Sequence, residues 1–127
     1  AFNFDTVAGI DYEVDVRQPI GRKINILRLS NGAPFMLNQS YRVAMNSYRG
    51  NGGGELLTRG AGIPFEELPQ RIVWMSSKDQ RQIIMDYIHA KGIIAPEPHN
   101  NWQFVPKAWA EPAIATDKRL LFPGCHG

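Results

Sequence analysis

The segment 48–54 combines three side-chain types that are common in ligand-binding loops. Tyr48 can stack on a flat ring, and Arg49 can either stack or pair with a phosphate. Asn51 can form a hydrogen bond with the edge of a base. These residue types in one short segment make it the first candidate for a binding site.

A run of glycines stands in the same segment, at Gly52, Gly53 and Gly54. Glycine backbone lets a flat ligand approach closely, and consecutive N–H groups can bind an anion. The run is followed by Glu55-Leu56-Leu57, whereas a P-loop requires Lys and Ser or Thr before a helix, so a P-loop is excluded. A ligand-binding loop and a plain tight turn both remain possible.

The aromatic residues Phe2 and Phe4 form a second candidate, because they stand just before a predicted strand. Aromatic rings in this position either close a hydrophobic core or remain exposed as a stacking surface. Core closure is the safer interpretation for one of the two rings.

Metal-binding and nucleophilic motifs are not recognisable. The three histidines, His89, His99 and His126, lack the spacing of a metal site, and the serines lack the G-x-S-x-G context of a nucleophile. The single cysteine, Cys125, cannot form an internal disulfide bond. We therefore expect no catalytic residue, no metal site and no cofactor in this chain.

The composition fits one small soluble domain. The chain has 127 residues, 43% of them hydrophobic, and a formal net charge of +2 with a pI near 8.9. A charge this small argues against binding to a nucleic acid polymer. The longest apolar runs fall well short of the roughly 18 residues of a membrane span. We expect a single domain over residues 1–127.

The N-terminal half predicts strands. Residues 10–16 alternate, with Ile, Tyr and Val on one face and acidic residues on the other, and 23–29 form a second apolar run that ends at Asn31-Gly32. An antiparallel pair is expected. A short edge segment is predicted over 33–37, and a third strand over 41–47.

The C-terminal half predicts one main helix. Residues 72–75 suit a short buried strand, and Ser76 or Ser77 can cap a helix that continues to Gly92. Trp102 and Phe104 share one face of a last strand. The segment 107–127 shows no period and is predicted to be a surface tail. The fold class is therefore α+β, with a mixed sheet and one main helix.

Three segments together resemble one known family. These are Phe4 to Asp15 followed by Pro19 and Gly21, then Tyr41 to Arg49 with the glycine run, and last Asn100-Asn101-Trp102. They are similar to the C-terminal domain of the 5′-nucleotidase family, and within it to the bacterial 2′,3′-cyclic-nucleotide 2′-phosphodiesterase and 3′-nucleotidase branch. The resemblance covers roughly residues 2 to 106 and implies the second half of that domain.

The resemblance implies substrate recognition without catalysis. In the family, an N-terminal metallophosphatase domain with two divalent metals hydrolyses nucleotides, and the C-terminal domain holds the base between two aromatic rings. Phe4 matches the first ring, and Leu56 stands where many members carry the second. Three alternatives follow: Tyr48 replaces that ring, Leu56 offers an apolar face of weaker stacking, or the base preference has changed.

The site implied by the resemblance consists of Phe4, Tyr48, Arg49, Asn51, Gly52, Gly53, Gly54 and Leu56. The expected partners are a nucleoside or nucleotide and the metallophosphatase domain. The expected location is the bacterial periplasm or exterior. Uncovered core faces predict self-association of the isolated half-domain. The alternative is a binding or scaffolding module that has lost nucleotide recognition, for which Leu56 is the best indication.

Overall fold

The computed structural model of the chain describes residues 4–124 and divides into two compact units. The first, the sheet unit, comprises Phe4–Gln39 together with residues 98–124. The second, the loop unit, comprises Ser40–Glu97. Each unit is described by itself.

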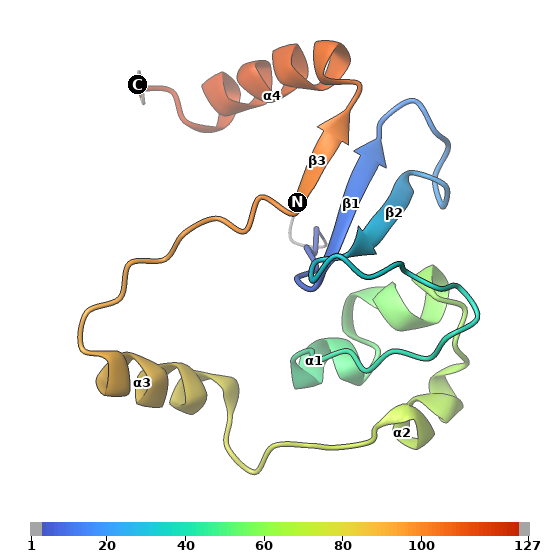
Figure 1. The fold of residues 1–127 in the computed structure, drawn as a ribbon, viewed down its shortest axis with the longest axis vertical. Coiled ribbons are helices and arrows are strands. Elements are labelled where there is room, and N and C mark those ends of the chain that lie inside the picture. Colours follow the sequence, from blue (N-terminus) through green and yellow to red (C-terminus); the bar gives the residue numbers. More distant parts are fainter. Residues whose placement is uncertain (1–3, 125–127) are drawn as a thin grey trace. The chain divides into compact units, whose positions relative to one another are not determined.

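The sheet unit is built on a three-stranded mixed sheet of order β2-β1-β3 (Figure 1). Strand β1 (Ile10–Asp15) pairs antiparallel with β2 (Ile24–Leu29) and parallel with β3 (Trp102–Val105). The two N-terminal strands, their antiparallel pairing and the last strand are therefore confirmed. The mixed sheet and the helices together confirm the α+β class.

The small core of this unit follows from the alternation along β1. Tyr12 and Val14 are buried, and the register places Trp102 and Phe104 beside them on β3. The Tyr12 and Trp102 rings are stacked, with centroids 6.0 Å apart, and Phe104 meets Trp102 edge-on at 5.3 Å. Aromatic pairs in these arrangements contribute more than their buried area alone.

Asn101 fastens the start of β3 to the segment before β1. Its Nδ2 donates to the carbonyl oxygens of Val7 and Ile10, both at 2.7 Å, and its own carbonyl accepts from the Tyr12 amide at 2.9 Å. In the sequence, Asn101 is recognisable only as part of the Asn100-Asn101-Trp102 motif. Its bridging role depends on contacts between residues more than ninety positions apart.

The segment after Pro106 is a helix, which corrects the prediction of a surface tail. Helix α4 (Lys107–Leu121) contains Pro112 and buries only Ala110. A helix that buries so little needs no continuous apolar stripe, so the lack of an apolar period over residues 107–127 did not exclude a helix. With α3, the structure has two long helices where one main helix was expected.

The loop unit is made of short helical turns and one longer helix. Its elements are α1 (Ser47–Gly50), η1 (Gly53–Glu55), η2 (Leu56–Gly60), η3 (Phe65–Glu67), α2 (Leu68–Arg71) and α3 (Gln80–Lys91). The helix predicted after residue 76 is thus confirmed as α3. Its N-cap is Asp79, whose side chain accepts from the Gln82 amide at 2.9 Å, rather than Ser76 or Ser77.

Three predicted strands are wrong. Residues 33–37 and 72–75 do not form strands. Residues 41–46 do not form one either, and residue 47 is already the first residue of α1. A strand needs a neighbouring strand with which to form hydrogen bonds, and the described residues provide none for these segments. The 72–75 run is also exposed rather than buried, since Trp74 keeps 77% of its surface open.

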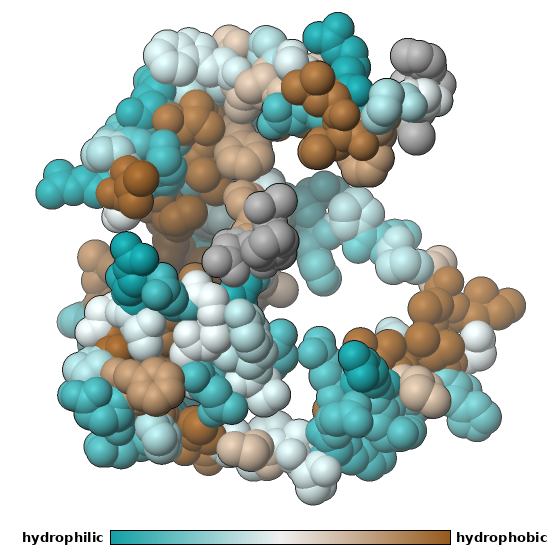
Figure 2. Space-filling view, turned by 180° about the vertical axis from the view of Figure 1, so that it is seen from behind, coloured by the Kyte–Doolittle hydropathy of each residue, from teal (hydrophilic) through white to brown (hydrophobic). Residues whose placement is uncertain are grey.

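Many apolar side chains of both units are exposed, and Figure 2 shows brown, hydrophobic side chains on the surface. They include Ile83, Ile84, Tyr87 and Ile88 of α3, the residues whose spacing predicted that helix. No helix among residues 4–124 is both long enough and apolar enough to span a bilayer.

Candidate functional site

Arg49 lies inside the glycine segment rather than projecting from it. It is 9% exposed, and it is the only buried charged residue that the structure describes. Its Nη1 donates to the Gly53 carbonyl at 3.1 Å, and its guanidinium lies 5.4 Å from the centre of the Tyr48 ring. Its backbone amide donates to the Asn46 side chain, which caps α1.

Two of the glycines are required by close packing. A Cβ on Gly53 would lie 2.5 Å from the Tyr48 carbonyl oxygen and 2.6 Å from its ring. Gly52 has a φ of 90°, and its Cβ would approach the Leu68 and Phe65 side chains to 3.1 Å. The turn is therefore closely packed, because Gly53 lies directly against Tyr48 and Gly52 has a backbone conformation that favours glycine.

The other candidate residues of this segment remain accessible. Tyr48 keeps 62% of its surface open, Leu56 is also exposed, and Asn51 is the exposed C-cap residue of α1. Gly54 and Glu55 both have positive φ values, of 70° and 59°. A glutamate in that region is uncommon, and such backbone is concentrated at functional sites.

Phe4 lies on the aromatic cluster of the sheet unit. Its ring is 5.7 Å from Trp102 and 6.1 Å from Phe104, yet 56% of the residue is exposed. One side of the ring is thus packed while much of it is open, which suits a stacking surface as well as a lid on the core. Phe2, the other aromatic of this motif, lies outside the described residues.

The structure groups Tyr48, Arg49, Asn51, Gly52, Gly53, Gly54 and Leu56 in the loop unit and places Phe4 in the sheet unit. The loop residues lie together because they are neighbours in the sequence, and their role as a binding site stays a prediction. A clamp formed jointly by Phe4 and the loop stays a prediction.

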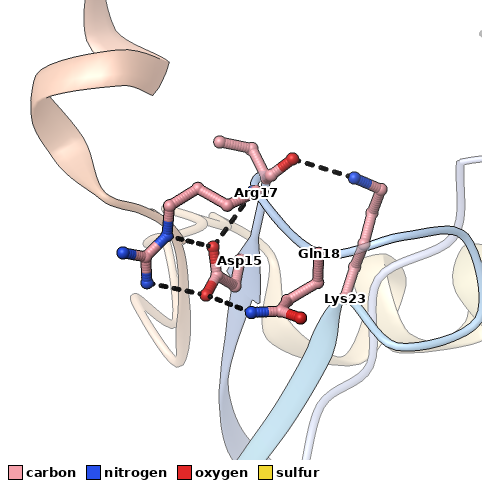
Figure 3. Close-up of polar contacts among 5 residues, drawn as sticks. Asp15, Arg17, Gln18 and Lys23 are labelled. Atoms are coloured by element: carbon pink, nitrogen blue, oxygen red, sulfur yellow. Dashed lines mark hydrogen bonds and ion pairs between the residues drawn. The ribbon is translucent and has the colours of Figure 1, made fainter.

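A charged hollow at the end of the β1–β2 hairpin was not anticipated. It has a volume of about 450 Å³ and is lined by Glu13, Asp15, Arg17, Gln18, Arg22, Lys23, Ile24, Asn25 and Val105. Asp15 accepts two bonds from the Arg17 guanidinium, at 3.0 and 2.9 Å, and Lys23 donates to the Val16 carbonyl (Figure 3). The spacing of Asp15 and Arg17, two residues apart, is the feature of the sequence from which this ion pair could have been predicted.

The Asp15 pKa predicts a pH-dependent stability. Hydrogen bonds from Arg17 lower the pKa of this carboxyl well below its usual range. A lowered folded-state pKa adds stability that is present above the unfolded pKa near 4 and is lost as the pH falls. We expect Asp15→Asn to lower Tm at pH 7, and the difference from the parent to shrink between pH 5 and pH 2 in thermal melts. A difference that stays constant over this range would contradict the role of the ion pair.

A second hollow of about 420 Å³ adjoins the aromatic cluster. It is lined by Thr6, Val7, Ala8, Pro98, His99, Asn100, Asn101 and Trp102. Among the residues from 4 to 124, no group of three or more His, Cys, Asp or Glu side chains could hold a metal ion. The lining of this hollow offers an aromatic ring at Trp102 and hydrogen-bonding side chains at Thr6, His99 and the two asparagines.

Comparison with known proteins identifies a family that the first part of the chain resembles. The family described as "5′-nucleotidase, C-terminal domain" matches residues 1–59. The resemblance to the 5′-nucleotidase C-terminal domain is therefore confirmed over this segment. The matched segment holds every residue of the candidate site, from Phe4 to Leu56. No solved structure matches the chain.

Curated bacterial relatives extend the similarity beyond residue 59. The chain is 35% identical over 117 residues to the trifunctional nucleotide phosphoesterase protein YfkN of Bacillus subtilis. It is 31% identical over 120 residues to a 2′,3′-cyclic-nucleotide 2′-phosphodiesterase/3′-nucleotidase of Haemophilus influenzae, and 30% over 121 residues to that of Salmonella typhimurium.

The alignments cover most of this chain but little of the relatives. They include 84% of the chain and 8% of the Bacillus protein, and 83% of the chain and 17% of each of the other two. The chain thus corresponds to a small part of much longer proteins.

Proposed function

We propose that this chain is the base-recognition part of a metal-dependent nucleotide phosphohydrolase of the 5′-nucleotidase or 2′,3′-cyclic phosphodiesterase type. The observation that carries the proposal is the family match over residues 1–59, because all candidate site residues fall within it. Catalysis is assigned to a metallophosphatase domain of the longer protein, which would hold two divalent metals. By the same reasoning, we propose a periplasmic or extracellular location.

The loop geometry supports a recognition role. Binding a base by stacking requires an exposed ring that is already fixed, since ordering a free side chain on binding would reduce the affinity. Tyr48 meets both conditions, because it is largely exposed while its backbone and ring pack against Gly53. We therefore propose Tyr48 as the loop's stacking ring, in place of the aromatic residue that Leu56 replaces.

Phe4 supports the same role from the sheet unit. Its contacts with Trp102 and Phe104 hold the ring, and its open side is available to a base. Neutral polar groups for the base or ribose are available at Asn51, and an anion can use the glycine backbone. Arg49, by contrast, already donates to Gly53, so a phosphate would compete with that bond.

The second candidate is a module that keeps this fold and binds no nucleotide. Leu56 favours it, because an aliphatic side chain stacks on a base less strongly than a ring. The two candidates differ in one measurable property, which is the contribution of the base to affinity.

Calorimetric titration of the full-length protein with adenosine and with ribose tests the proposal. A base-recognition part should bind adenosine at least about tenfold more tightly than ribose, because base stacking contributes about 1–3 kcal/mol. Equal affinities, or no binding of either ligand, would favour the module without nucleotide recognition.

A further inference from the structure

The burial of Arg49 calls for an explanation. A buried cation is costly unless its donors are satisfied, and Arg49 is surrounded by the turn that follows it in sequence. The donor-acceptor pair with the Gly53 carbonyl spans four residues and closes the turn from α1 to η1. The same guanidinium lies near the Tyr48 ring, at a distance typical of a cation–π contact.

Gly53 contacts both Arg49 and Tyr48. Its Cα lies so close to Tyr48 that a Cβ would overlap both the carbonyl and the ring. One glycine is thus bonded by Arg49 through its carbonyl oxygen and packed against Tyr48 through its Cα. Gly53 is therefore the common contact of the Arg49 guanidinium and the Tyr48 ring, and it is called their anchor below.

We infer that Arg49 is a positioning residue, which fixes the turn 50–55 and thereby the exposed Tyr48 ring in the orientation that stacks on the base. This inference rests on the proposed function for its ligand. It assigns Arg49 to the loop's own backbone instead of to a phosphate. A planar guanidinium with several donors suits a carbonyl and a ring at once, whereas a lysine ammonium presents a single point charge.

The first test measures the turn without ligand. Hydrogen–deuterium exchange of the full-length protein is compared for the parent, Arg49→Ala, Arg49→Lys and Gly53→Ala. We expect at least about tenfold faster exchange at residues 50–55 in all three variants, because each removes the anchor, while peptides of β1 keep their parental rates. Arg71→Ala is the matched control, since its exposed pair with Glu67 has the same four-residue spacing and lies outside the turn.

The second test measures the preference for the base. The ratio of adenosine to ribose affinity should fall about tenfold in Arg49→Ala, and Arg49→Lys should fail to restore it. The double variant Arg49→Ala/Gly53→Ala should lose no more than either single variant, because both changes remove one anchor.

The outcomes separate this inference from the proposed function. Unchanged exchange at 50–55 in Arg49→Ala, or a full recovery of exchange and base preference in Arg49→Lys, would overturn the positioning role. If Arg49→Ala loosens β1 as well, Arg49→Lys, which keeps the charge and the aliphatic part of the side chain, decides the question in its place. A parent protein with equal affinity for adenosine and ribose would refute the proposed function. The exchange data would then still show whether Arg49 stabilises the turn 50–55.

Discussion

Replacing Trp102 with alanine is expected to lower the free energy of unfolding by about 3 kcal/mol. Trp102 contacts Phe4, Tyr12 and Phe104, so its ring joins the cluster on which the sheet unit is built. Little buried apolar surface remains to compensate, because the described residues of the sheet unit bury only Tyr12, Val14 and Ala110 among their apolar residues. Urea unfolding, followed by far-ultraviolet circular dichroism, measures the loss.

Trp109→Ala is the matched control for this change. Trp109 lies on α4 and is largely exposed, so its removal should change the stability by less than about 0.5 kcal/mol. Equal losses for the two tryptophan variants would contradict the central place of Trp102 in the cluster.

Changing Phe4 to leucine is expected to weaken adenosine binding about tenfold. Leucine keeps an apolar side chain against Trp102 but lacks a ring, so stacking with the base is lost while most of the packing remains. Calorimetry of the full-length protein measures the affinity, and a thermal melt checks that the fold is retained.

The control for Phe4 is another exposed phenylalanine of the sheet unit. Phe122 follows α4 and is 60% exposed, close to the 56% of Phe4, but it lies outside the matched segment 1–59. Phe122→Leu should leave adenosine affinity unchanged. If Phe4→Leu also leaves it unchanged, Phe4 serves the core and has no role as a stacking ring.

Local sequence patterns predicted correctly those elements whose backbone hydrogen bonds are formed within the element or with a neighbouring strand. The prediction of β1 from the alternation of residues 10–16 succeeded because β2, the next strand in the chain, pairs with it. The spacing after residue 76 predicted α3 because a helix forms its hydrogen bonds internally. The pattern of 41–47 failed because alternation does not reveal whether a second strand is present.

Residue types in the sequence singled out the candidate loop, but the contacts within it could not be predicted, and its role as a binding site stays a prediction. The types and order of residues 48–54 identified the loop, but the same residues suggested a phosphate for Arg49 where the structure gives it the Gly53 carbonyl. That bond depends on the backbone of the turn, with positive φ values at Gly52, Gly54 and Glu55. The Asn46 cap, three residues before Arg49, was the signal that a short helix starts there.

The helix α4 and the Asn101 bridge illustrate a different difficulty. The absence of a period over residues 107–127 argued against a helix, yet α4 forms there and buries only Ala110. The bridge joins Asn101 to Val7 and Ile10, and no local window of sequence contains both ends.

Base recognition by this chain is tested most directly by an NMR titration with adenosine and 3′-AMP. The amides to follow are those of Phe4, Tyr48 to Gly54, and Leu56. Recognition of the base predicts shifts concentrated at these residues, with the same set for both ligands and an added response to the phosphate in 3′-AMP. The titration is repeated on the full-length protein, and no shift at these amides there at millimolar ligand would contradict the account.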